Sequence, residues 1–291
     1  MKWTRGPRSA HLEDRRGERS RGRLPLPAGR GGRMGLGTIL LLFVLSVVFK
    51  QDFFSLVGGL DTGGGQMSTP PGPAASSPEE EKMVDFMSFL LEDNHKVWGK
   101  LFPSLGASYG PSGMVIFTDA TSSGCGFAQA ATGPFYCPAD QKVYLDLAFF
   151  NELARRFAAP GDFAQAYVVA HEIGHHVQQE LGIERKMRDM QRQRPDLKNQ
   201  LSVRLELQAD CLAGVWAHDA AQRGLLERGD VDEGMAAASA VGDDRIQRSA
   251  GRYVNPETFT HGSSAQRVEW FQVGLRSGDP NQCDTFASGA V

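Results

Sequence analysis

The sequence predicts an α+β fold that is mainly helical, contains a small sheet and is preceded by one transmembrane helix. Three observations favour this class: long helical patterns in the second half of the chain, two short strand patterns before them, and a single apolar run near the N-terminus. The chain has 291 residues, of which 41% are hydrophobic and 22% are charged. This composition is typical of a globular chain with a sizeable core.

Charge is distributed unevenly along the chain. The first 33 residues carry ten Lys or Arg and three Asp or Glu, whereas the remaining residues carry 21 basic and 31 acidic side chains. An apolar run from Met34 to Phe49 follows the basic segment directly. As a helix, this run would span about 24 Å, somewhat less than a hydrocarbon core of about 30 Å. Basic residues on one flank and an acidic region on the other favour a single-pass anchor in the cytoplasmic membrane, with the N-terminus inside.

A cleaved signal peptide is the alternative interpretation of this run. The residues that follow it, Phe49-Lys50-Gln51, offer no pair of small residues for cleavage, so a retained anchor is favoured. The next segment is rich in Gly, Pro and Ser and lacks apolar periodicity, which predicts a flexible linker. We therefore expect a basic cytoplasmic arm over residues 1–33, an anchor and interface over 34–57, a linker over 58–81 and an extracytoplasmic domain over 82–291.

The secondary structure of this domain is expected in the following order. A helix over residues 79–101 is indicated by a stripe of apolar side chains at helical spacing. Strands over 112–119 and 142–147 are indicated by runs of consecutive apolar residues. Further helices are expected over 149–157, 162–182, 202–217 and 263–274.

The helix expected from Asp162 to Gly182 contains the sequence HEIGH. Residues four apart on a helix lie on one face, so His171 and His175 can bind one tetrahedral metal ion. Glu172 follows the first histidine directly and can accept a proton from a zinc-bound water without coordinating the metal. The motif therefore indicates a catalytic site with one Zn²⁺ per chain, of the type found in zincin-like metallopeptidases.

Two histidines leave such a site one protein ligand short. No third histidine follows at the spacing of the metzincin extension. On the helix expected over 202–217, Glu206 and Asp210 share a face within apolar surroundings, where unpaired carboxylates would be costly. We expect Glu206 to complete the ligand set and Asp210 to accept the free ring N–H of His171. His218 and His261 are the alternative ligands.

Several segments together resemble a known family. They are HEIGHHVQQELG, RLELQADCLAGVWAHDA, FTHGSSAQRVEWFQVGLRSGDPNQCDTF and the N-terminal KWTRGPRSAHLEDRRG. The chain resembles the neutral zinc metallopeptidases of the bacterial YpfJ type over most of its length. The resemblance implies a membrane-anchored, gluzincin-like zinc hydrolase. In zincins, an edge strand before the zinc-binding helix holds an extended substrate, and residues 143–146 are the candidate for that role.

The four cysteines all follow the apolar run. An even number in an exported domain indicates two disulfides, for which the sequence alone leaves three pairings open. Cys125 and Cys137 are close in sequence and are the preferred pair, which leaves Cys211 and Cys283 for the other. No CxxC pair is present, so a structural zinc site made of cysteines is disfavoured.

Other polar residues are candidates for stabilising a developing oxyanion. His261 lies in a predicted loop, and Tyr253 and His218 are alternatives. His176 points about 100° away from His175 on the helix, which favours a packing or supporting role.

These observations predict a zinc-dependent peptidase that hydrolyses peptide bonds of polypeptides, with Glu172 as general base. One alternative is a non-catalytic, zinc-stabilised interaction module on the cell envelope, although a closed structural site has no use for a base. Another is a zinc hydrolase of a non-peptide amide. The sequence contains no P-loop, dinucleotide fingerprint, serine nucleophile elbow or aromatic–basic surface, so nucleotide and nucleic-acid binding are not expected.

Overall fold

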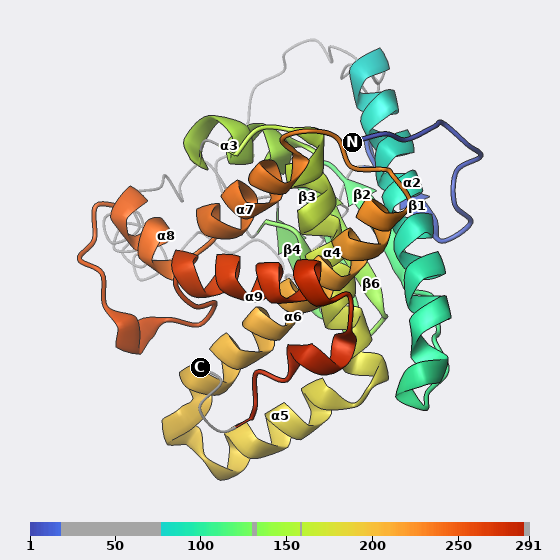
Figure 1. The fold of residues 1–291 in the computed structure, drawn as a ribbon. Coiled ribbons are helices and arrows are strands. Elements are labelled where there is room, and N and C mark those ends of the chain that lie inside the picture. The colour runs from blue at the N-terminus through green and yellow to red at the C-terminus, as the bar shows by residue number, and fades with distance from the viewer. Residues whose placement is uncertain (19–76, 130–132, 158, 288–291) are drawn as a thin grey trace, which may run out of the picture. The chain divides into compact units, whose positions relative to one another are not determined.

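The computed structural model describes residues 1–18, 77–129, 133–157 and 159–287, which belong to one compact unit (Figure 1). Its elements in chain order are β1 (Leu12–Asp14), α2 (Pro78–Leu101), η1 (Phe102–Leu105), β2 (Gly113–Phe117), β3 (Ala120–Ser123), β4 (Gly126–Gln129), β5 (Phe135–Cys137), β6 (Lys142–Asp146), α3 (Ala148–Phe157), α4 (Asp162–Glu180), α5 (Ile183–Gln193), η3 (Pro195–Leu197), α6 (Lys198–Gln222), α7 (Asp230–Ala240), α8 (Asp243–Ser249), η4 (Pro256–Thr258), α9 (Ser264–Ser277) and η5 (Pro280–Cys283). Helix α4 lies at the centre and packs against α2, α6 and α7.

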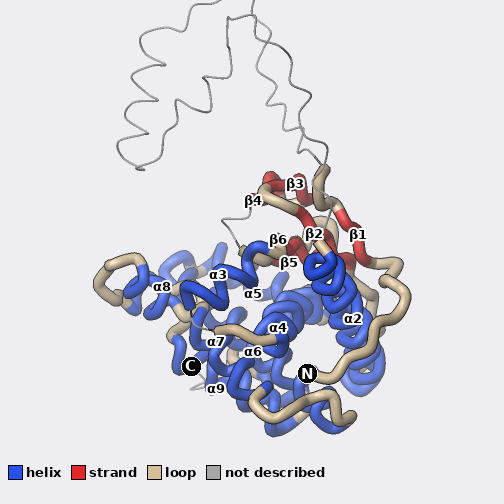
Figure 2. Tube along the Cα trace, turned by 90° about the horizontal axis from the view of Figure 1, so that it is seen from above, coloured by secondary structure: helices blue, strands red, loops and turns tan. Residues whose placement is uncertain are grey.

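A four-stranded sheet lies along one side of the helices, with the hairpin β3–β4 beyond it (Figure 2). The strand order is β1-β2-β6-β5, and β1, β2 and β6 are parallel while β5 is antiparallel to β6. Alternating side chains face opposite sides, as the pleat requires. One set joins the main core with the helices: Met114, Ile116, Val143 and Leu145. The other set forms a small cluster with Ala128 of the hairpin: Val115, Phe117, Cys137 and Tyr144.

The predicted α+β class is wrong, because the sheet is largely parallel and the fold is mixed α/β. Neighbouring parallel strands need a long crossover connection, and α2 lies in the connection between β1 and β2. Strand β1 consists of three residues, Leu12–Asp14, within the segment predicted to be a basic arm. A strand so short and so polar has no apolar pattern by which the sequence could reveal it.

The predicted membrane-spanning helix is also not found. Residues 34–49, on which it was placed, lie outside the described residues. Within the part of the chain that the structure describes, no helix is both long enough and apolar enough to cross a bilayer.

Residues 1–18 pack onto the domain. Met114 pairs with Leu12 where β2 meets β1, and two of the arginines that suggested a cytoplasmic arm are ion-paired with α2. Arg8 lies 2.8 Å from Asp85, and Arg16 lies 2.6 Å from Glu81. Because β1 is paired with β2, residues 12–14 belong to the same folded unit as the rest of the sheet.

The long helices agree with their predicted positions. Helix α2 begins at Pro78 behind a capping box, in which Ser77 accepts from the amide of Glu80 and the Glu80 side chain accepts from the amide of Ser77. Helices α4, α6 and α9 lie where apolar periodicity predicted them. The hairpin β3–β4, strand β5 and helices α5, α7 and α8 were not predicted.

Helices α6 and α9 are in contact through their backbones. A Cβ atom added to Gly274 would lie 1.9 Å from the carbonyl oxygen of Cys211, and one added to Gly214 would lie 2.1 Å from that of Phe271. Only glycine fits at either position. The two glycines therefore bring α9 close enough to α6 for its side chains to reach the centre of the domain.

Candidate metal centre

Helices α4 and α6 approach each other closely beside the HEIGH motif. A Cβ atom on Gly174 would lie only 2.9 Å from the carbonyl oxygen of Ala209, so the motif's glycine permits this approach. Gly174 lies between His171 and His175 in sequence, and Ala209 lies between Glu206 and Asp210. The contact therefore sets the two pairs of polar side chains opposite each other.

The structure brings together the three residues predicted as zinc ligands. Nε2 of His171 lies 3.3 Å from one carboxylate oxygen of Glu206, and Nε2 of His175 lies 3.5 Å from the other. One ligand atom from each residue falls within a group no wider than 4.8 Å. Ligands about 2.0–2.1 Å from a tetrahedral zinc ion are about 3.4 Å apart. Two imidazoles and one carboxylate at this spacing fit zinc and leave a fourth position for water or substrate.

Each histidine has a hydrogen-bond partner on its other ring nitrogen. Nδ1 of His171 lies 2.9 Å from Asp210, and Nδ1 of His175 lies 2.9 Å from Oε1 of Gln178. An acceptor at Nδ1 holds the proton there and keeps the lone pair of Nε2 free for a metal. Asp210 thus lies where the sequence predicted it, whereas Gln178 was not predicted.

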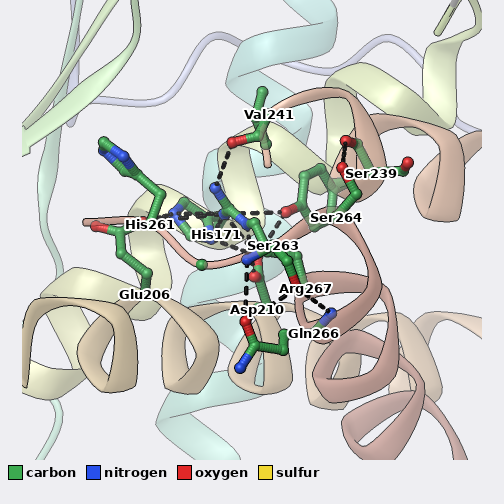
Figure 3. Close-up of polar contacts among 12 residues, drawn as sticks. His171, Glu206, Asp210, Ser239, Val241, His261, Ser263, Ser264, Gln266 and Arg267 are labelled. Carbon is green, nitrogen blue, oxygen red and sulfur yellow. Dashed lines mark hydrogen bonds and ion pairs between the residues drawn. The ribbon is translucent and has the colours of Figure 1, made fainter. Parts of the chain in front are cut away.

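Asp210 is fully buried and accepts hydrogen bonds from several groups (Figure 3). Arg267 of α9 donates to both carboxylate oxygens, at 2.8 and 2.9 Å, and the Tyr167 hydroxyl donates at 2.5 Å. Burial alone would raise the pKa of Asp210, but Arg267 and His171 lower it below its ordinary value. The carboxylate therefore stays ionised beneath His171.

Arg267 was not predicted as a site residue. It is 2% exposed, and its Nη2 atom lies 3.3 Å from Nδ1 and 3.4 Å from Nε2 of His171. Burial alone would lower the pKa of His171, and Arg267 lowers it further, but Asp210 and Glu206 raise it to about 9. The only sign of this role in the sequence is a single arginine beside the apolar residues Val268, Trp270 and Phe271.

Glu172 differs from the other carboxylates of the centre. Glu172 is only 8% exposed, yet its carboxylate has no hydrogen-bond or ion-pair partner among the described residues. Asp210, by contrast, is held by Arg267, Tyr167 and His171. A carboxylate without a fixed partner among the described residues suits a group that exchanges protons with water.

His261 lies on the same side of the cluster as Glu206 (Figure 3), and the charge of Glu206 contributes to raising its pKa. Its Nδ1 atom lies 3.2 Å from Asp243, which also accepts hydrogen bonds from the amides of residues 260, 261 and 262. The hydrogen bond to Asp243 is the main cause of the raised pKa. The imidazole is 48% exposed, so it is open to a ligand. Asp243, at the start of α8, was not predicted.

The structure does not bring the other predicted polar residues to the cluster. Tyr253 is 99% exposed on the loop between α8 and η4. Nδ1 of His218 donates to the carbonyl oxygen of Leu275, 2.8 Å away. His176 is buried between the Tyr136 hydroxyl, at 3.0 Å, and the carbonyl oxygen of Gly110, at 2.6 Å. These histidines support packing rather than the metal centre.

The strand predicted to bind substrate is not at an edge. Strand β6 is paired with β2 over residues 142–146 and with β5 over residues 142–144. The edge strand on this side is β5, Phe135–Cys137. The prediction failed because β5 has only three residues and follows the hairpin, so it carries no recognisable strand pattern.

The cysteines are paired as preferred from the sequence. Cys125 is bonded to Cys137 and Cys211 to Cys283, and no free cysteine is present in the described chain. The first disulfide joins the hairpin β3–β4 to the sheet. The second joins α6 to η5, close to the metal centre.

A second acidic group does not offer an open site. Asp162, Asp230 and Glu233 lie together, but the amino group of Met1 lies 2.6 Å from Asp162 and 3.4 Å from Asp230. The Met1 amino group therefore lies beside two of these carboxylates and offsets part of their charge.

Comparison with known proteins agrees with this geometry. The family described as "Putative neutral zinc metallopeptidase" matches residues 1–286. "Uncharacterized protein YpfJ" of Escherichia coli strain K12 is 44% identical, over 98% of this chain and 99% of its own length. "Uncharacterized protein Mb2605" of Mycobacterium bovis and "Uncharacterized protein Rv2575" of Mycobacterium tuberculosis are each 45% identical, over 66% of this chain and 67% of their own. No solved structure matches. The chain belongs to the neutral zinc metallopeptidase family.

Proposed function

We propose that the protein hydrolyses peptide bonds of polypeptides at a centre with one zinc ion per chain, held by His171, His175 and Glu206. The observation that carries this proposal is the spacing of the three ligand atoms, with both Nε2 atoms facing Glu206 at 3.3 and 3.5 Å. When bound at such a centre, zinc polarises a carbonyl oxygen and lowers the pKa of a water to about 7. Side chains of the protein perform the remaining steps, which are proton transfer and stabilisation of the developing charge.

Glu172 acts as the general base. It lies next to a ligand in sequence, is nearly buried, and has no partner among the described residues. It accepts the proton of the attacking water and passes it to the leaving amine as the C–N bond breaks. Buried surroundings favour this transfer because few solvent molecules compete for the proton.

His261 stabilises the negative charge that develops on the carbonyl oxygen. Its hydrogen bond to Asp243 raises its pKa, so the protonated ring persists to higher pH than an ordinary histidine. Three backbone amides also bind Asp243 and fix the position of this pair. A cationic donor that is already in position stabilises the negatively charged oxygen of the transition state more than the neutral carbonyl oxygen of the substrate.

The test is Glu172→Gln in the full chain, with Glu180→Gln on the same helix as the matched control. Zinc content is measured by mass spectrometry, and hydrolysis is measured on a peptide library. We expect both variants to keep about one zinc, while Glu172→Gln loses hydrolysis by about 10²–10⁴-fold. Near-wild-type hydrolysis by Glu172→Gln would show that the proposed base is wrong. Cleavage of non-peptide amides but no peptide would redirect the substrate class.

We also propose that the domain works in an oxidising compartment outside the cytoplasm. The support is the pairing of all four cysteines into two disulfides. Such bonds persist in exported proteins and are rare in the reducing cytosol. Mass spectrometry of unreduced peptides from the native host tests this, and four free thiols in the isolated protein would contradict it.

A further inference from the structure

The hydrogen-bond partner of His175, Gln178, is the first member of a buried series of hydrogen bonds. Gln178 accepts from Nδ1 of His175 at 2.9 Å, and its amide nitrogen donates to Oε1 of Gln208 at 3.1 Å. Nε2 of Gln208 then donates to the carbonyl oxygen of Cys283 at 2.9 Å. Gln178, Gln208 and Cys283 are 0%, 6% and 1% exposed, so water does not compete with these bonds. The metal centre is thus connected to the C-terminal segment.

The donor and acceptor roles in this series of hydrogen bonds are fixed by its last member, the carbonyl group of Cys283. A backbone carbonyl can only accept, so the amide nitrogen of Gln208 must face Cys283 and its oxygen must face Gln178. The amide nitrogen of Gln178 also donates to the carbonyl of Leu205 at 2.7 Å, which enforces the same orientation. The oxygen of Gln178 therefore faces His175, and Nδ1 of His175 must carry the proton. This is the tautomer that leaves Nε2 free beside Glu206.

The segment after α9 is bound to α6 next to this series of hydrogen bonds. The disulfide to Cys211 holds Cys283, and Cys211 lies three residues after Gln208 on α6. Arg204 donates to the carbonyl of Thr285 at 3.2 Å, and the Thr285 hydroxyl donates back to the carbonyl of Arg204 at 2.6 Å. The disulfide therefore fixes the carbonyl group that orients Gln208.

We propose that Gln178 and Gln208 are positioning residues for His175, and that the Cys211–Cys283 disulfide tightens zinc binding through them. The proposal rests on the zinc site proposed above. Gln178 contacts the ring directly, so its loss has the larger effect. Gln208 and the disulfide have a smaller effect, because Leu205 still orients Gln178 when they are removed.

The experiment measures zinc affinity of the full chain by competition with a chelator. The variants are Gln178→Ala, Gln208→Leu and the pair Cys211→Ala with Cys283→Ala. The matched control is Cys125→Ala with Cys137→Ala, which removes a disulfide that takes no part in this series of hydrogen bonds. We expect Gln178→Ala to weaken zinc binding by about 10–100-fold, as loss of a ligand's hydrogen-bond partner does. Gln208→Leu and the Cys211/Cys283 pair should each weaken it by roughly 3–10-fold, and the control pair by less than about 2-fold.

A double-mutant cycle separates this route from a general loss of stability. In the Gln178→Ala background, removing the Cys211–Cys283 disulfide should cause no further loss of zinc affinity, because the connection is already broken. If the combined variant instead lost zinc affinity by the product of the two separate losses, the proposal would be overturned. Wild-type zinc affinity in Gln178→Ala would overturn it as well. Gln208→Leu retains all four cysteines and keeps the test decisive if the disulfide variant does not fold. Long-range proton–nitrogen NMR of the zinc-loaded wild type should show the His175 proton on Nδ1, and a proton on Nε2 would also overturn it. Failure of the wild type itself to bind zinc would instead refute the proposed function.

Discussion

Replacing Arg267 by methionine is expected to destabilise the metal-free protein strongly. The side chain of Arg267 is 3% exposed and forms two hydrogen bonds with Asp210, which is fully buried. The substitution keeps an apolar side chain in place but leaves the carboxylate without its cation. Removing one partner of a buried ion pair costs about 3–5 kcal/mol.

The surroundings of Asp210 place the expected cost at the lower end of that range. The hydroxyl of Tyr167 and the ring of His171 still donate to the carboxylate after Arg267 is removed. We therefore expect a loss of about 3 kcal/mol in the free energy of unfolding. A domain of this size loses about 2–4 °C in Tm for each kcal/mol, so the expected decrease is about 6–12 °C.

Urea and thermal denaturation followed by circular dichroism, with a chelator present, measure this loss. Arg276→Met is the matched control, since Arg276 is exposed in the last turn of the same helix. That variant should change stability by less than about 0.5 kcal/mol. Arg267→Lys keeps the charge but not the bidentate geometry, so its loss of stability should lie between those of Arg267→Met and Arg276→Met. A loss below about 1 kcal/mol for Arg267→Met would refute the inference that the ion pair supports the fold.

Three further predictions concern the ligand, the pH profile and the helix contact. Glu206→Ala should remove nearly all bound zinc, measured by mass spectrometry after dialysis, and full occupancy would exclude Glu206 as a ligand. Hydrolysis that needs protonated His261 is present at low pH and is lost as pH rises through its raised pKa. Asp243→Asn removes the main cause of that rise, so the alkaline decline of kcat/KM should move to lower pH, and an unmoved decline would contradict the role of this pair. Gly274→Ala should cost at least about 1–3 kcal/mol in urea denaturation, because its Cβ would lie 1.9 Å from a carbonyl oxygen, whereas Gly99→Ala has free space and should not destabilise the protein.

The sequence was sufficient to predict the parts of the centre that depend on local periodicity. His171 and His175 share a helix face whatever the tertiary structure, and Glu206 with Asp210 share another. Only one pairing of these faces places all four polar side chains together. The same periodicity predicted α2, α4 and α9 at close to their observed bounds, whereas α6, expected over 202–217, extends over Lys198–Gln222.

The remaining parts depend on contacts between segments far apart in the chain. Arg267 reaches Asp210 only because two glycines bring α9 onto α6. Gln178 and Gln208 are ordinary polar helix residues until the C-terminal segment supplies the carbonyl of Cys283. Strand β1 has no pattern of its own and forms because β2 offers it a free edge. Short strands and isolated polar residues carry little local signal, so their roles appear only in the assembled fold.

The pairing of β1 with β2 has a topological consequence. Residues 14 and 78 both belong to one folded unit, so folding fixes both ends of the interval between them. Closing an interval of this length costs about 3–4 kcal/mol of chain entropy, which the contacts of residues 1–18 must offset. A fragment that begins at α2 escapes this cost but leaves Met114 to Phe117 of β2 as an uncovered apolar edge, which favours association between chains. The full chain is therefore better suited to assays of activity and metal binding than a fragment that begins at α2.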